Sequence, residues 1–146
     1  MAEKKPKLVW KPKKVTDKII QRVRLGVVEG ANHARNKIVE ALSRTQPVQT
    51  SESGRRRGLD PSKPWTAPKM VDGDYRRSIS VRRQISRRAA QASIHSNDHK
   101  AARLEFGFVG KDKLGKQINQ EPRPAIRATL LKERSAIIKI INRGIR

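Results

Sequence analysis

The segment from Gly110 to Lys116 places glycines and a lysine in an order that suits phosphate binding. Gly110, four residues, Gly115 and Lys116 follow most of the pattern of a nucleotide-binding loop. Such a loop also needs a Ser or Thr after the lysine to hold magnesium, and a helix that begins at once so that its N-terminus faces the phosphate. Here Gln117 takes the hydroxyl position, and the next residues, INQEP (118–122), do not start a helix promptly. We therefore interpret the segment as a Gly/Lys turn and expect no nucleotide cofactor.

His95, Asp98 and His99 form the pattern H-x-x-D-H, which supplies side chains of the kind that bind metal ions. The group would provide two or three ligands of a metal site. It falls in a predicted turn with no fourth ligand nearby. We therefore expect a structural or solvated role for these residues, and no bound metal.

The carboxylates of Asp72, Asp74 and Glu105 are the second group with reactive side chains, and they would suit a metal-dependent nuclease. The run Asp72-Gly73-Asp74 also has the chemistry of a turn before a strand. A lone Glu on a strand is commonly the partner of an Arg. We therefore expect that the chain is not an enzyme, and we keep nuclease activity as an alternative for experiment.

Positive charge is the strongest signal in the sequence. Lys and Arg number 35 against 13 Asp and Glu, a formal net charge of +22 over 146 residues. Self-repulsion of this size disfavours the isolated compact chain, so we expect a polyanionic partner: nucleic acid first, an acidic protein surface next, and an anionic membrane last. No zinc-finger spacing, aromatic stacking platform or clear helix-turn-helix is present, so contact with DNA should be to its backbone. The candidates for contact with DNA or an acidic partner are Arg55, Arg56, Arg57, Arg82, Arg83, Arg87 and Arg88.

The remaining composition predicts one domain with a thin core. Apolar residues make up 35% of the chain and aromatic residues 3%, so neighbouring subunits are expected to help bury its faces. There is no cysteine, which excludes disulfides and thiolate metal sites. The apolar runs are too short to span a bilayer, and the basic N-terminus lacks the apolar region of a secretory signal, so we expect synthesis inside the cell.

The N-terminal half of the chain is expected to contain one long helix between two irregular segments. Residues 1–15 are rich in Lys and Pro and predict an extended basic arm. Apolar residues at three- and four-residue steps then predict a helix from Thr16 to about Arg44. Gly26 and Gly30 weaken this helix by about 1 kcal/mol each relative to Ala, or instead permit a neighbouring helix to approach closely. Residues 45–74, with four Pro and three Gly, predict a long protruding loop.

The C-terminal half is expected to form a small antiparallel sheet and a final helix. Alternating side chains predict strands at 75–85 and 89–95, joined as a hairpin near 86–88. A third strand is predicted around residues 104–109, followed by a polar loop to Glu121. Residues 125–141 predict a helix, with Pro124 in its first turn and Gly144 after its end. The expected fold class is α+β, with the long N-terminal helix and the C-terminal helix packed on the sheet, in a single domain over residues 16–146.

Three short motifs in this order resemble those of the head–tail joining family of long-tailed double-stranded-DNA bacteriophages, also called neck or tail-completion proteins. The resemblance covers roughly residues 16–142. The chain departs from the family pattern at Lys100, where a Tyr is usual, at Phe108, where a small residue is usual, and over 48–70, which reads as an insertion. The matching residues are Gly73, Tyr75, Arg77, Ser78 and Ile79; Ala101, Glu105, Phe106 and Gly107; and Arg123, Pro124 and Ala125.

The resemblance implies a non-enzymatic virion protein at the head–tail junction. It implies a six- or twelve-fold homo-oligomeric ring between the portal-side connector, adaptor or stopper ring and the tail terminator or tail tube, with DNA passing through the lumen. Closed rings arise from heterologous interfaces whose rotation closes. The alternative from the charge alone is a stand-alone basic nucleic-acid-binding protein of the nucleoid or ribosomal type.

These motifs also carry expectations for single residues. We expect Glu105 and Arg123 to be ion-pair groups of the fold or the ring interface. We expect Phe106 to lie in the core, and Gly107 and Pro124 to set the backbone.

Overall fold

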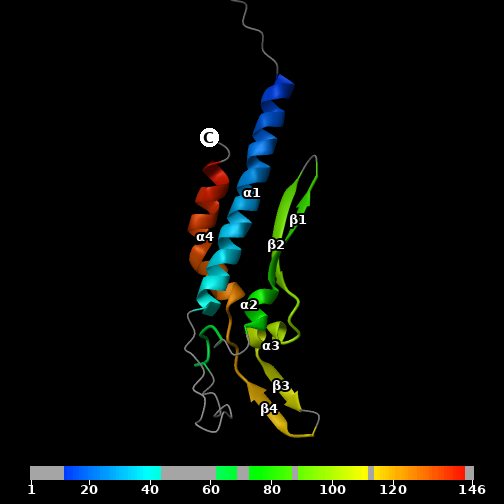
Figure 1. The fold of residues 1–146 in the computed structure, drawn as a ribbon, viewed down its shortest axis with the longest axis vertical. Coiled ribbons are helices and arrows are strands. Elements are labelled where there is room, and N and C mark those ends of the chain that lie inside the picture. The colour runs from blue at the N-terminus through cyan, green and yellow to red at the C-terminus, as the bar shows by residue number, and fades with distance from the viewer. Residues whose placement is uncertain (1–11, 44–61, 69–72, 87–88, 112–113, 144–146) are drawn as a thin grey trace, which may run out of the picture.

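The computed structural model describes residues 12–43, 62–68, 73–86, 89–111 and 114–143, which form an α+β arrangement around one long helix. Helix α1 (Pro12–Ser43) lies between α4 (Ile126–Arg143) on one side and a ribbon of β1 (Ile79–Ile85) and β2 (Ala90–Ser96) on the other (Figure 1). The expected α+β fold class, with a long N-terminal and a C-terminal helix packed on small antiparallel sheet, is confirmed, and the two helices also pack against each other. The sheet is two separate hairpins rather than one unit.

A stripe of buried residues at four-residue steps explains how α1 packs. From the N-terminal to the C-terminal end of this stripe, the side chains become larger, from glycine to leucine. A Cβ on Gly26 would lie 2.8 Å from the carbonyl oxygen of Ile141, so the two helices are in direct backbone contact there. The larger residues further along face a wider core. Of the two interpretations of these glycines, the one in which they permit close approach of a neighbouring helix is therefore confirmed. The buried stripe is Gly26, Gly30, Ala34, Ile38 and Leu42.

The ends of the helices differ from the predicted ones. Helix α1 begins at Pro12, so residues 12–15 are helical and the prediction that they belong to an extended arm was wrong. The rest of the arm, residues 1–11, lies outside the described residues. Helix α4 begins at Ile126, directly after Pro124 and Ala125, and ends at Arg143.

Only part of the predicted loop 45–74 is described. Residues 62–68 lie against the chain before α4, because the Trp65 amide donates to the Pro122 carbonyl at 2.8 Å and Arg123 Nε donates to the Ser62 carbonyl at 2.8 Å. Residues 73 and 74 also belong to the folded part.

Residues 75–78 form a helical turn, not the start of a strand. Helix α2 (Asp74–Ser78) follows Gly73, whose φ of 74° is favoured by glycine. The Arg77 amide donates to the Gly73 carbonyl at 3.0 Å, and the Ser78 hydroxyl donates to the Tyr75 carbonyl at 2.7 Å. The predicted hairpin that follows is confirmed, with Ile79 opposite Ser96 and Ile85 opposite Ala90.

The predicted third strand was also misplaced, because residues 101–106 form helix α3 (Ala101–Phe106). Asp98 lies in the turn just before this helix, where its carboxylate accepts from the Lys100 amide at 2.8 Å. Phe106 is 71% exposed, so the prediction that it lies in the core was wrong. The prediction placed Phe106 on one face with Leu104 and Phe108 because alternate residues share a face in a strand; in a helix they do not.

A second hairpin follows α3 and points away from the rest of the fold (Figure 1). It pairs β3 (Phe108–Lys111) with β4 (Gln117–Gln120) in antiparallel register. The polar loop predicted up to Glu121 therefore contains a strand. The turn interpretation of the Gly/Lys segment is confirmed, since Gly115 has φ 79° and a strand, not a helix, follows Lys116.

The core is small, as the composition predicts. Its fully enclosed members are Ile38, Leu42, Ile79 and Ala125, from α1, β1 and the start of α4. Partly buried residues around them include Tyr75, Ile94 and Leu130. No helix in the described residues is both long and apolar enough to cross a bilayer.

Candidate functional site

The carboxylate of Glu105 holds the three motifs of the sequence together. It lies on α3 and is 7% exposed. Its Oε1 accepts hydrogen bonds from the backbone amides of Ala125 and Ile126, both at 2.7 Å, and from the Tyr75 hydroxyl at 3.1 Å. Its Oε2 accepts from the Arg127 amide at 3.2 Å. One side chain thus joins the segments of Tyr75, Glu105 and Ala125.

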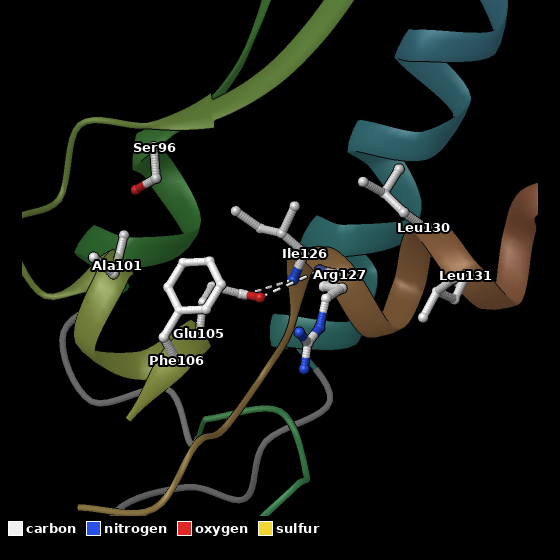
Figure 2. Close-up of a pocket in the computed structure, with 9 residues that line it drawn as sticks. Ser96, Ala101, Glu105, Phe106, Ile126, Arg127, Leu130 and Leu131 are labelled. Carbon is white, nitrogen blue, oxygen red and sulfur yellow. Dashed lines mark hydrogen bonds between the residues drawn. The ribbon is translucent and has the colours of Figure 1, made fainter. Parts of the chain in front are cut away.

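The role of Glu105 follows from the position of these amides. The first amides of a helix have no partner within the helix and carry partial positive charge. Glu105 satisfies the start of α4 as a cap from a remote part of the chain (Figure 2). No ion pair joins Glu105 to a described cation. The predicted ion pair is therefore replaced by backbone amides.

Tyr75 completes the set of hydrogen-bond donors to Glu105. It lies on α2 and packs beside the core. Burial, followed by the negative charge of Glu105 and the hydrogen bond to it, raises the pKa of Tyr75 well above its usual range. The phenol therefore stays protonated and donates to the carboxylate throughout the physiological pH range.

The other residues of the first motif also support this junction. Ile79 is 1% exposed in the core, and its carbonyl accepts from Arg35 Nε of α1 at 3.2 Å. Ser78 Oγ lies 2.5 Å from Ser96 Oγ, which ties α2 to the end of β2. Arg77 pairs with Asp74 on the surface of α2.

The Gly107 and Arg123-Pro124-Ala125 motifs bring the chain to the start of α4. Gly107 has φ 79°, and a Cβ there would lie 2.7 Å from the Gln120 carbonyl oxygen, so the prediction that it sets the backbone is confirmed. Arg123 makes no ion pair among the described residues; its amide donates to the Leu104 carbonyl at 2.6 Å and its side chain donates to Ser62. Pro124 and Ala125 are buried.

An open apolar pocket of about 440 Å³ lies beside Glu105, between α3 and the first turns of α4 (Figure 2). Phe106 and Leu131 stand at this pocket with 71% and 68% of their surface exposed. Isolated exposed apolar residues are normal, but grouped ones mark contact surfaces. We call this surface the α3–α4 groove; its lining is Ser96, Ala101, Ala102, Glu105, Phe106, Ile126, Arg127, Leu130 and Leu131.

The candidate polyanion contacts are described only in part. Arg82 and Arg83 lie exposed on β1. Neither makes a hydrogen bond or ion pair with the described residues. Arg55, Arg56, Arg57, Arg87 and Arg88 lie outside the described residues.

The predicted metal-binding and catalytic side chains make several separate contacts in the described part of the chain; among them, His99 Nδ1 lies 3.5 Å from Asp98 Oδ1. His95 Nε2 lies 3.1 Å from Ser80 Oγ, and the Asp98 carboxylate accepts from the Lys100 amide just before α3. Asp74 is paired with Arg77, and Glu105 is occupied by backbone amides. Asp72 lies outside the described residues. In the described part of the chain, no three His, Asp or Glu residues are grouped as a metal ion requires.

The α3–α4 groove was missed by sequence reasoning. A local signal is Leu131, an apolar residue directly after Leu130 that widens the apolar face of α4. Phe106 carried the opposite expectation because its segment was assigned to a strand.

Comparison of the sequence with protein-family models and with curated proteins, and of the fold with solved structures, gives no match.

Proposed function

We propose that the chain is a structural, non-enzymatic subunit of the neck of a long-tailed double-stranded-DNA bacteriophage. In this proposal it forms a six- or twelve-fold ring between the portal-side connector and the tail tube, and DNA passes through the ring. The observation that carries the proposal is the Glu105 junction. Tyr75, Glu105 and Ala125 belong to three separate motifs of the resembled family, and they meet through hydrogen bonds of 2.7–3.1 Å.

The surface supports an assembling subunit. The core has few enclosed side chains, while large apolar residues remain exposed on several elements. In a small domain, such surface is stabilised by burial against neighbours. The α3–α4 groove, with Phe106 and Leu131 at its walls, is in this proposal part of the contact between neighbouring subunits.

The charge supports a place beside DNA. A net charge of +22 is tolerated when phosphate lies nearby. Arg82 and Arg83 are exposed and face no described acidic partner.

The second candidate is a stand-alone basic nucleic-acid-binding protein of the nucleoid or ribosomal type, which the exposed arginines of β1 also favour. The two functions differ in what holds the protein together. Sedimentation of the full chain at 1 M NaCl tests this difference, since salt screens charge contacts but not apolar ones. A species of six or twelve times the 16.6 kDa subunit mass supports the ring, and a monomer at every concentration contradicts it.

A further inference from the structure

The outward face of the β1–β2 ribbon is entirely polar. Ile79, Val81 and Ile94 are partly or fully buried, so they mark the face of the ribbon that lies toward α1. Strand side chains alternate between faces, and the register places the remaining residues together on the opposite face. The three cross-strand pairs of this face are Ser80 with His95, which are half-buried, and Arg82 with Ser93 and Gln84 with Gln91, which are exposed.

The segment that forms the ribbon contains no acidic residue. From Tyr75 to Asn97 the sequence holds six Arg, no Lys and no Asp or Glu. Surface segments of soluble proteins usually mix both signs of charge. Arginine, with its planar guanidinium group, binds phosphate oxygens in pairs, so an Arg-only segment is typical of polyanion contact.

The fold uses other arginines near the ribbon but leaves Arg82 available. Arg35 donates to the Ile79 carbonyl, Arg24 donates to the Ser86 carbonyl at 2.5 Å, and Arg76 donates to Ser43 Oγ at 3.2 Å. Arg82 is exposed on the outward face and makes no hydrogen bond or ion pair with a described residue. The side chains of Gln84 and Gln91 on this face are likewise exposed and make no hydrogen bond with a described residue.

We propose that the outward face of the β1–β2 ribbon binds duplex DNA by entering its major groove. The major groove, about 12 Å wide and 8.5 Å deep, admits a two-stranded antiparallel ribbon. Gln84 and Gln91 lie opposite each other on this face, next to the Ser86–Ala89 turn that Arg24 of α1 contacts, and would add uncharged polar surface within the groove. Arg82 lies two residues further back, about 7 Å along the strand, and contacts a phosphate at the groove edge.

Shape and charge select this partner. The acid-free face complements the phosphate backbone. The major groove of double-stranded RNA is deep and narrow and does not admit side chains in this way, so DNA should be preferred. The inference deepens the proposed function by naming a DNA-contacting surface, but the binding itself does not require a ring.

Fluorescence anisotropy of the full chain with a labelled 20-base-pair duplex tests the proposal. Arg82→Ala should weaken binding about eightfold at 0.1 M NaCl and reduce the slope of log K against log salt by about 0.9, the contribution of one phosphate contact. The matched control Arg134→Ala removes the same charge from the exposed face of α4 and should change binding less than about twofold. Arg82→Lys keeps the charge and should restore most of the slope.

A second pair of variants places a negative charge on each surface. Ser93→Glu puts a carboxylate opposite Arg82, and Ser135→Glu puts one on α4. Only Ser93→Glu should reduce binding strongly, with both variants folded by circular dichroism. Equal effects of Arg82→Ala and Arg134→Ala, or equal competition by a 20-base-pair RNA duplex, would overturn the proposal. Absence of a ring in sedimentation leaves this binding result unaffected, so the two proposals fail separately.

Discussion

The carboxylate of Glu105 accepts a 2.7 Å hydrogen bond from the backbone amide of Ala125, 20 residues further along the chain. Through this bond and its neighbours, a buried side chain on α3 replaces the local cap that α4 lacks. The junction fixes where α4 starts, and thus how it lies along α1. The first two predictions concern this junction.

Glu105→Ala should destabilise the chain by about 2–4 kcal/mol, because it leaves several amides of α4 without a partner in a buried site. Glu105→Gln should cost less, since the amide oxygen still accepts hydrogen bonds. Urea unfolding measures both. Glu121→Gln, at an exposed position, is the control and should stay within about 0.5 kcal/mol of the wild type. A Glu105→Ala variant as stable as this control would show that the cap is not needed.

Tyr75 is the only tyrosine of the chain, so the absorbance of phenolate at 295 nm reports it alone. Its pKa is raised in the folded state, mainly by burial and then by Glu105. Its contribution to stability is therefore present below the unfolded pKa of about 10 and is lost as the pH rises above it. In native buffer the absorbance should rise only where the chain unfolds, and in 6 M guanidinium it should rise near pH 10.

The Tyr75→Phe variant isolates this effect from the titration of lysines. Above pH 10, its melting temperature should fall less steeply than that of the wild type. A native titration with an ordinary midpoint near pH 10 would mean that Tyr75 is not held by Glu105.

Gly26→Ala tests the close contact of α1 with α4. Alanine would favour an isolated helix by about 1 kcal/mol, but its Cβ would meet the Ile141 carbonyl oxygen at 2.8 Å. We expect a net loss of about 1–2 kcal/mol in chemical unfolding, since the helices must move apart. Gly30→Ala should cost less, because its nearest neighbour is the side chain of Ile141 at 3.2 Å, which can rotate. A more stable Gly26→Ala variant would contradict the packing.

Leu131→Ser and Phe106→Ser test the α3–α4 groove as a subunit contact. Both residues are largely exposed, so each change should alter the unfolding free energy of the subunit by less than about 1 kcal/mol. Each should shift the sedimentation profile from the ring toward smaller species. Lys132→Ser, at a neighbouring exposed position on α4, should leave the profile unchanged. Rings that persist in both serine variants would place the contact elsewhere.

The elements with long repeating patterns were predictable from the sequence. In helix α1 and helix α4 the apolar residues recur every three or four positions, and in the β1–β2 hairpin they alternate. Each pattern is long enough to distinguish a helix from a strand. The small residues Gly26 and Gly30 also indicated close helix packing. These features depend mainly on nearby residues.

The short elements could not be predicted in the same way. Residues 75–78 and 101–106 show an alternation that fits a strand over so few positions, but Gly73, Asp98 and the Tyr75–Glu105 hydrogen bond favour helical turns. Strand β4 has one apolar residue, Ile118, so its own sequence gives little strand signal; it is stabilised by pairing with β3. Tertiary contacts decide such segments.

The candidate site was predicted in its residues but not in its chemistry. The motifs named Glu105, Tyr75 and Ala125, yet nothing local showed that the carboxylate would bind backbone amides 20–22 residues away. From the sequence alone, a lone Glu in a predicted strand is expected to pair with an Arg. In the structure, the backbone amides at the start of α4, which carry partial positive charge, take the place of the arginine.

Whether the chain is a component of tailed virus particles is the most direct test of the proposed neck function. Tailed particles are purified from the source of this sequence and labelled with a gold-conjugated antibody against the chain. Electron microscopy then shows where on the particles the label lies. We expect label at the head–tail junction, in full particles and in particles whose tails have been detached from the neck. Label absent from all particles, with the chain present in the infected cell, would contradict it.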